Sequence, residues 1–141
     1  MIKFKDYKHM TPIQVRFADI DRLNHVNNAC YLTYCEVARV GYFREVLKDA
    51  VNWESNGFIL ARSEVDYLAP IFLYDEVYCF TKVSYMGTKS ISVLNEILKK
   101  QDGKWTECAT VTGVLVAMDY RNNCSIEIPS AWRELISKYE S

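Results

Sequence analysis

Hydrophobic and polar side chains alternate from Ile13 to Phe17, which predicts a first strand. A polar turn follows, and Asn27 or Asn28 then provides a good N-cap for a helix that runs to about Lys48. The first half of this helix is apolar on nearly every face. A helix of that kind has to be covered on all sides by other elements.

The second half of the chain predicts four strands and a short terminal helix. The alternating and apolar runs that predict these strands cover residues 59–67, 76–85, 89–98 and 105–118. Asp102-Gly103 is the strongest hairpin signal and joins the last two of them. The last strand is apolar on both faces, so we expect a central or interfacial position for it. The terminal helix should run from Ser130 to Tyr139, with Ser130 as a candidate cap.

The predicted order is one strand, a long helix and then four antiparallel strands. This order indicates an α+β fold in which an antiparallel sheet curls around the central helix. No linker, repeat or biased segment divides the chain, so residues 1–141 are expected to form a single domain. A curled sheet of this kind leaves strand edges exposed, and pairing of two copies would cover them.

Composition narrows the functional class. The 141 residues are 50% hydrophobic. The 17 basic and 18 acidic side chains give a net charge of -1, so the chain lacks the excess of basic residues that is typical of proteins that bind nucleic acids or membrane surfaces. No apolar run approaches the roughly 20 residues of a membrane span, and residues 1–6 lack the features of a secretory signal. A cytoplasmic protein is therefore expected.

The cysteines support the same expectation. There are five of them, an odd number that is typical of reduced thiols in a cytoplasm. No C-x-x-C spacing occurs and only two histidines accompany them, so no metal site is predicted. Cys30 and Cys35 fall within the apolar helix, where core packing is the expected role.

The most informative segment is the polar turn before the helix. It brings Asp19, Asp21, His25 and a pair of asparagines close to a buried helix, a costly position unless these groups cap, pair or catalyse. A helix N-terminus offers free N–H groups and partial positive charge, which suit an oxyanion, and Asp21 could reach the space in front of it. A carboxylate beside an oxyanion site is a minimal set for acyl transfer. The same residues also suit a plain turn in which His25 bonds to the loop backbone.

These residues form a recognisable pattern. Its main blocks are Asp19-Ile20-Asp21, His25-Val26-Asn27-Asn28, Tyr31-Leu32 and Glu36-Val37-Ala38-Arg39, and further blocks lie at residues 65–70, 74–77, 87–90 and 128–129. In this order the pattern resembles the hotdog-fold acyl-CoA thioesterases related to 4-hydroxybenzoyl-CoA thioesterase. The resemblance covers nearly the whole chain and leaves the substrate open.

The resemblance implies a hotdog fold and homodimers with active sites at the subunit interface, often paired into tetramers. It assigns Asp21 as the catalytic carboxylate, Asp19 as a supporting or structural residue, and a backbone N–H at about Asn28 as the oxyanion donor. His25 is a further catalytic candidate. Acyl-ACP thioesterases of the same superfamily carry Asn where this chain has Leu23.

Other site candidates are less specific. Asn24 occupies the family's usual glycine position, which Asn can fill because it tolerates positive φ. Glu36 could face the site or pair with Arg39 three residues on. Candidate substrate-binding residues, each also compatible with a core or solvent-exposed role, are Tyr31 and Tyr67 for the acyl group and Lys89 and Ser90 for the pantetheine or phosphates of CoA.

The sequence thus predicts a thioesterase that releases a carboxylate and free CoA, with Asp21 as nucleophile or general base. No metal or other cofactor is expected, since CoA is part of the substrate. The expected partners are an acyl-CoA and further copies of the chain in a homodimer or homotetramer, with no nucleic acid or membrane. Two alternatives stay open: an acyl-ACP thioesterase, for which the near-neutral charge offers no basic docking patch, and a non-catalytic hotdog module that binds acyl thioesters.

Overall fold

The computed structural model describes residues 6–141, and the prediction about a secretory signal falls largely on residues 1–5, outside the described part. Two short 3-10 helices, η2 (Phe17–Asp19) and η3 (Lys48–Ala50), accompany the main elements. In chain order these are β1 (His9–Ile13), α1 (Cys30–Leu47), β2 (Asn56–Tyr67), β3 (Glu76–Met86), β4 (Ser90–Gln101), β5 (Lys104–Asp119), β6 (Cys124–Ser125) and α2 (Ser130–Glu140).

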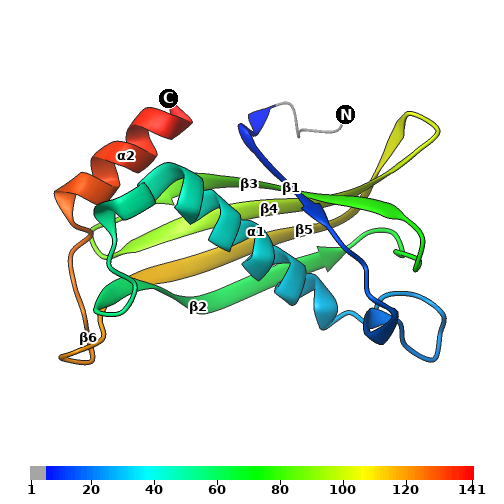
Figure 1. Cartoon of the computed structure of the whole chain (residues 1–141), viewed down its shortest axis with the longest axis horizontal. Coiled ribbons are helices and arrows are strands. Elements are labelled where there is room, and N and C mark those ends of the chain that lie inside the picture. Colours follow the sequence, from blue (N-terminus) through cyan, green and yellow to red (C-terminus); the bar gives the residue numbers. More distant parts are fainter. Residues whose placement is uncertain (1–5) are drawn as a thin grey trace.

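The strands form one antiparallel sheet in the order β1-β3-β4-β5-β2, and the short β6 pairs with the end of β5. The pairing register shifts in β2 between Leu60 and Arg62, in β3 between Val83 and Tyr85, and in β5 at Cys108, opposite Ile97 and Leu98 of β4. Such irregularities increase the twist of a sheet, and here the sheet curls around α1 (Figure 1). The predicted α+β architecture, a curled antiparallel sheet with a central helix, is confirmed.

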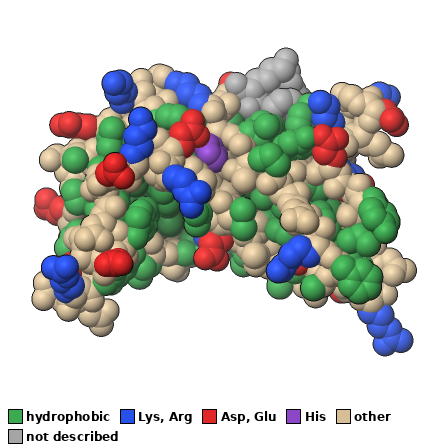
Figure 2. Space-filling view, viewed as in Figure 1, with side chains coloured by type: hydrophobic (Ala, Val, Ile, Leu, Met, Phe, Trp, Pro, Cys, Tyr) green, Lys and Arg blue, Asp and Glu red, His purple; other side chains and the backbone are tan. Residues whose placement is uncertain are grey.

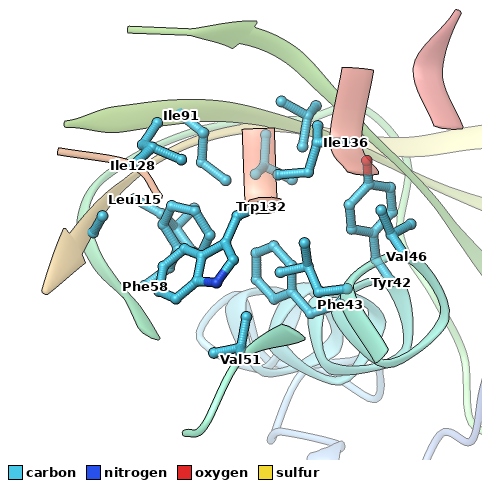
Figure 3. Close-up of a cluster of buried hydrophobic side chains, with 14 residues drawn as sticks. Tyr42, Phe43, Val46, Val51, Phe58, Ile91, Leu115, Ile128, Trp132 and Ile136 are labelled. Carbon is cyan, nitrogen blue, oxygen red and sulfur yellow. The ribbon is translucent and has the colours of Figure 1, made fainter. Parts of the chain in front are cut away.

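The core follows the length of α1. Near the N-terminal half of the helix, Tyr31, Tyr34, Cys35 and Ala38 pack against the sheet. Near the C-terminal half, a second cluster joins α1 to the sheet and to α2, with Phe43, Phe58 and Trp132 in close contact (Figure 3). The expected core role is confirmed for Cys35, which is fully buried, whereas Cys30 is only partly buried.

Helix α1 is covered on one side only. Val37 and Val40 lie on its outer face and are 50% and 53% exposed. The expectation that other elements cover this helix on every side is therefore wrong within one chain. Its apolar outer positions would need a second molecule to cover them.

The first strand is displaced from its predicted position. β1 ends at Ile13, where the predicted strand begins, and it contains Pro12. Pro12 is tolerated because β1 is an edge strand that pairs only with β3. The alternation continues to Val15 without a partner strand, and Phe17, which is 84% exposed, begins η2.

Local predictions in the second half of the chain mostly hold. Asp102 and Gly103 both have positive φ, 52° and 77°, as a tight hairpin requires, and β5 lies inside the sheet between β4 and β2. Helix α2 begins at Ser130 as predicted, but the Ser130 side chain makes no capping hydrogen bond, because Ser130 is already the first helical residue after Pro129. Within residues 6–141, no helix is both long and apolar enough to cross a membrane.

Candidate active site

The loop between η2 and α1 is closed by its own backbone. Ile20 and Val26 face each other as an isolated antiparallel bridge, and the Asp21 N–H donates to the His25 carbonyl at 3.0 Å. The Asn24 N–H donates to the Asp21 carbonyl at 3.0 Å, and Asn24 has φ 67°, as the sequence predicted. Asp21 is therefore held in a tight, hydrogen-bonded loop.

The side chain of Asp19 anchors this loop to the helix. Its carboxylate is 1% exposed and accepts hydrogen bonds from the Arg16 guanidinium at 2.8 and 3.1 Å and from the Tyr34 hydroxyl at 2.7 Å. Burial opposes ionisation of Asp19, but these hydrogen bonds outweigh it and lower the pKa of the carboxyl. Its backbone carbonyl also accepts from the Asn27 N–H at 2.8 Å. Asp19 thus has the structural role that the sequence suggested.

Asn27 accepts hydrogen bonds from the backbone at the start of α1. Its side-chain oxygen accepts from the Ala29 N–H at 2.9 Å, and its carbonyl accepts from the Cys30 N–H at 2.9 Å. The N-cap itself is Ala29, which makes no side-chain capping hydrogen bond, so the predicted cap at Asn27 or Asn28 is wrong; Asn27 instead holds the turn just before the helix, which begins at Cys30. The N–H of the exposed Asn28 has no acceptor among residues 6–141, so it is free to bind an incoming oxygen.

Asp21 and His25 occupy the rim of the loop. The Asp21 side chain is partly exposed and accepts a hydrogen bond from the Leu23 N–H at 2.8 Å. The Leu23 side chain is 71% exposed and offers no polar group to Asp21. The His25 Nδ1 lies 3.4 Å from the Val26 carbonyl, a backbone contact of the kind expected for a plain turn.

Cys30 also lies beside the loop, but its surroundings lower its reactivity as a nucleophile. The Cys30 Sγ is 3.8 Å from the Asp19 carboxylate. Burial and the negative charge of Asp19 raise the pKa of the Cys30 thiol. Because the thiolate is the nucleophilic form of cysteine, Cys30 is a poor nucleophile at neutral pH. Among the described residues, no three His, Cys, Asp or Glu side chains form a group that could hold a metal ion.

The two candidate tyrosines lie together beside the helix start. The Tyr67 hydroxyl, at the end of β2, donates to the Asn28 carbonyl at 3.0 Å. Its ring meets the Tyr31 ring edge-on, with 5.0 Å between centroids. Tyr31 is 2% exposed, and burial raises its pKa to about 12. Tyr67 is therefore the member of the pair that an incoming substrate can touch.

Lys89 and Ser90 do not join this group within one chain. Lys89 is exposed just before β4, whereas Val26 of the loop belongs to the same buried cluster as Ile97, which lies seven residues after Ser90 in that strand. Seven residues of strand span about 23 Å. Figure 1 shows the β3–β4 turn and the loop before α1 at opposite ends of the sheet. Lys89 and Ser90 can meet Asp21 only across an interface between two copies.

Sequence reasoning missed the partners of Asp19. Alternation predicts a strand at Arg16, and Tyr34 falls in the apolar first half of the predicted helix, but the structure joins both side chains to one carboxylate. The spacing of Asp19 and Tyr34 carries no local signal, since their contact depends on how α1 lies against the loop. The alternative pairing of Glu36 with Arg39 is not observed, because no ion pair joins them in the described residues.

Comparison with known proteins agrees with this architecture. The family model of the thioesterase-like superfamily matches residues 15–136. The chain is similar to a thioesterase from Thermus thermophilus, solved in complex with coenzyme A and Zn, with 34% identity, a TM-score of 0.83 and 96% of each chain covered. It is also similar to PA2801, a putative thioesterase from Pseudomonas aeruginosa, with 27% identity, a TM-score of 0.81 and coverage of 92% of this chain and 98% of that one.

A curated relative gives a shorter match. The uncharacterized protein YsmA of Bacillus subtilis (strain 168) is 26% identical over 87 residues, which make up 62% of this chain and 58% of that protein. The chain thus aligns with less than two thirds of this relative's length. Together, the family match, the curled sheet and the central helix assign the chain to the thioesterase-like superfamily, with a hotdog fold.

Proposed function

We propose that the protein hydrolyses acyl-CoA thioesters to a carboxylate and free CoA, with Asp21 as the reacting carboxylate. One observation carries the proposal: a partly exposed carboxylate and the free Asn28 N–H belong to the same closed loop at the start of α1. The similarity to a thioesterase solved with coenzyme A, at 34% identity over 96% of both chains, supports CoA thioesters as the substrate class.

The barrier in thioester hydrolysis lies in forming the tetrahedral oxyanion. The Asn28 N–H and the positive end of α1 would stabilise this charge as it develops on the carbonyl oxygen. The leaving thiolate needs little help, because a free thiol has a pKa of about 8.5. The Tyr67 hydroxyl supports this arrangement indirectly, since its hydrogen bond to the Asn28 carbonyl holds the turn that presents the N–H.

Asp21 can act by either of two routes. As a nucleophile, its oxygen attacks the thioester carbon, the C–S bond breaks, and water then hydrolyses the mixed anhydride. As a general base, it takes a proton from water while the hydroxide attacks the same carbon; the C–S bond then breaks and CoA leaves as the thiolate, which takes up the proton. Rapid mixing followed by mass spectrometry separates the routes, because only the first forms an acylated protein.

We further propose that the working unit contains at least two copies of the chain. Val37 and Val40 leave apolar surface on the outer face of α1, and Ile59 and Leu60 are each 42% exposed on the edge strand β2. Covering both would remove apolar area and a strand edge from water. A second copy would also bring Lys89 and Ser90 of one chain within reach of the loop of the other. Light scattering after size exclusion measures this state directly.

A thiol-release assay tests the activity. The panel comprises short-chain, long-chain and aromatic acyl-CoAs together with matching acyl-ACPs, with a blank for the protein's own thiols. The proposal predicts steady turnover of at least one acyl-CoA and slower turnover of the corresponding acyl-ACP. Saturable binding of acyl-CoA without thiol release would instead identify a non-catalytic module, and turnover of acyl-ACP alone would identify the carrier protein as the partner.

A further inference from the structure

Helix α2 reaches the turn between strands β3 and β4, at the end of the sheet opposite the Asp21 loop (Figure 1). Arg133 lies in the first turn of α2, and its Nη2 donates to the Gly87 carbonyl at 2.7 Å and lies 3.5 Å from the Thr88 carbonyl. Arg133 makes no ion pair within residues 6–141. Its charged donor is therefore spent on the backbone of the β3–β4 turn, where it makes a stronger hydrogen bond than a neutral donor would.

The bond from Arg133 takes the place of the usual hydrogen bond of a β-turn. In such a turn the first carbonyl accepts from the fourth N–H, which here would join the Gly87 carbonyl to the Ser90 N–H. The Gly87 N–H does donate to the Ser90 carbonyl at 2.7 Å, but in the described part of the chain the Gly87 carbonyl accepts no backbone N–H. The guanidinium of Arg133 satisfies this carbonyl instead.

Side-chain packing gives the turn little support. An open cavity of about 700 Å³ lies between the turn and the start of α2, and both Thr88 and Arg133 line it. Thr88 and Lys89 are exposed. Hydrogen bonds therefore hold the turn, and besides Arg133 the donors are the Ile128 N–H to the Thr88 carbonyl at 2.9 Å and the Ala117 N–H to the Lys89 carbonyl at 2.8 Å.

Helix α2 is itself firmly attached to the core. Trp132 is 4% exposed, and its Nε1–H donates to the Ala50 carbonyl at 3.0 Å. Ile136, one helical turn further on, is fully buried in the same cluster (Figure 3). Arg133 thus extends from a well-fixed helix, and its hydrogen bond couples the position of the β3–β4 turn to that of α2.

The turn carries Lys89, the candidate contact for the phosphates of CoA. Lys89 is exposed, and no carboxylate in the described residues forms an ion pair with it. Figure 2 shows acidic and basic side chains interspersed over the end of the molecule where α2 lies. An anion meets no uniformly positive surface there, so its binding depends on where single cations such as Lys89 are held.

We propose that Arg133 is a positioning residue for CoA: it holds the β3–β4 turn so that Lys89 meets the phosphates of a CoA thioester bound by a second copy of the chain. The inference rests on the proposed function for the contact between Lys89 and CoA, and it adds the residue that sets the position of Lys89. Arg133 acts through the turn and needs no contact with the substrate.

Calorimetric titration with CoA tests this role, with pantetheine as the matched ligand that lacks the phosphates. Wild type should bind CoA at least about fivefold more tightly than pantetheine. Arg133→Met keeps the aliphatic part of the side chain but removes the donors, so it should weaken CoA by about three- to fivefold, the size of the exposed ion pair that Arg133 positions, and change pantetheine by less than about twofold.

Two further variants serve as rescue and control. A single nitrogen of Arg133 makes both contacts with the turn, so Arg133→Lys, which keeps one charged donor, should stay within about twofold of wild type for CoA. Arg121→Met makes the same substitution in the exposed 119–123 turn and should leave the affinity for CoA unchanged. An equal loss of affinity for CoA and pantetheine in Arg133→Met would indicate a general structural role and overturn the proposal.

A double variant separates positioning from direct contact. If Arg133 acts through Lys89, Arg133→Met should have little further effect in a Lys89→Gln background, whereas a direct contact with the phosphates would add its full three- to fivefold, roughly, and overturn the proposal. Wild type that does not bind CoA, or binds it no better than pantetheine, would also overturn it, whether or not Arg133→Met folds. The titration requires no turnover, so CoA binding with these effects but without thiol release would contradict only the proposed hydrolysis.

Discussion

The Tyr34 hydroxyl donates a 2.7 Å hydrogen bond to the Asp19 carboxylate and so ties helix α1 to the loop that carries Asp21. Asp19 is also bound by Arg16, and its backbone carbonyl accepts from Asn27 at the start of the helix. Asp19 therefore holds both the loop that carries Asp21 and the turn that leads into α1. Asp19 positions the loop, which leaves Asp21 free to react.

Removing the Tyr34 hydroxyl should destabilise the protein. Tyr34→Phe leaves the ring in the core but deprives a buried carboxylate of a charge-assisted hydrogen bond, a loss of about 1.5–3 kcal/mol in the free energy of unfolding. Tyr74→Phe makes the same change on a side chain that is 95% exposed and should cost less than about 0.5 kcal/mol. Urea denaturation of both variants measures the difference, and equal losses would refute the anchoring role of Asp19.

The pH dependence of stability should carry the signature of Asp19. Its pKa in the folded protein lies below the ordinary value of 3.8, so ionised Asp19 stabilises the fold at neutral pH. That contribution is present above pH 3.8 and is lost as the pH falls through the lowered pKa. The difference in unfolding free energy between wild type and Asp19→Asn should therefore be constant from pH 7 to 5 and shrink below about pH 4. A difference that grows in acid would contradict this sign.

The loop conformation should depend on residue 24. At φ 67° a glycine is unstrained, whereas a residue with a Cβ and no local side-chain hydrogen bond is disfavoured by roughly 1 kcal/mol. Asn24→Gly should thus retain stability within about 0.5 kcal/mol, and Asn24→Ala should lose about 1 kcal/mol together with part of the thiol-release activity. Thermal unfolding and the assay check both variants. Equal behaviour of the two would show that the backbone at residue 24 does not matter.

Lys89 tests the proposal that two copies form the site. If Lys89 of one chain meets the CoA phosphates bound at the other, Lys89→Gln should raise KM for acyl-CoA up to about fivefold, the size of an exposed ion pair, without changing kcat. The matching N-acetylcysteamine thioester lacks the phosphates and should be hydrolysed equally well by the variant. Lys104→Gln, at the opposite end of the sheet, is the control. A similar loss with both thioesters would exclude phosphate binding by Lys89.

Much of the fold could be predicted because its signals are local. Positive φ at Asn24, Asp102 and Gly103 follows from the turn chemistry of these residues, and alternation is visible directly in the long strands. The first strand was misplaced because Pro12 and the partly polar sequence around it do not look like a strand. Its edge position, which makes proline acceptable, is a tertiary property.

The site was predictable only in part, because several of its contacts depend on tertiary packing, which leaves no local signal in the sequence. The motif gave Asp19 a supporting or structural role, which its burial and hydrogen bonds fit, but the contact between Asp19 and Tyr34 depends on the packing of α1. The order of motifs along the chain also does not show that Lys89 and Asp21 lie at opposite ends of the sheet. The i, i+3 spacing of Glu36 and Arg39 also suggested an ion pair, which does not form among residues 6–141.

The most direct test of the account is the rate of CoA release by Asp21→Asn, compared with Asp49→Asn, which makes the same substitution at an exposed site in η3. Loss of a group that acts as acid, base or nucleophile should lower kcat at least about 100-fold. The account therefore predicts such a loss for folded Asp21→Asn and none for Asp49→Asn. Activity of Asp21→Asn within about threefold of wild type would contradict it.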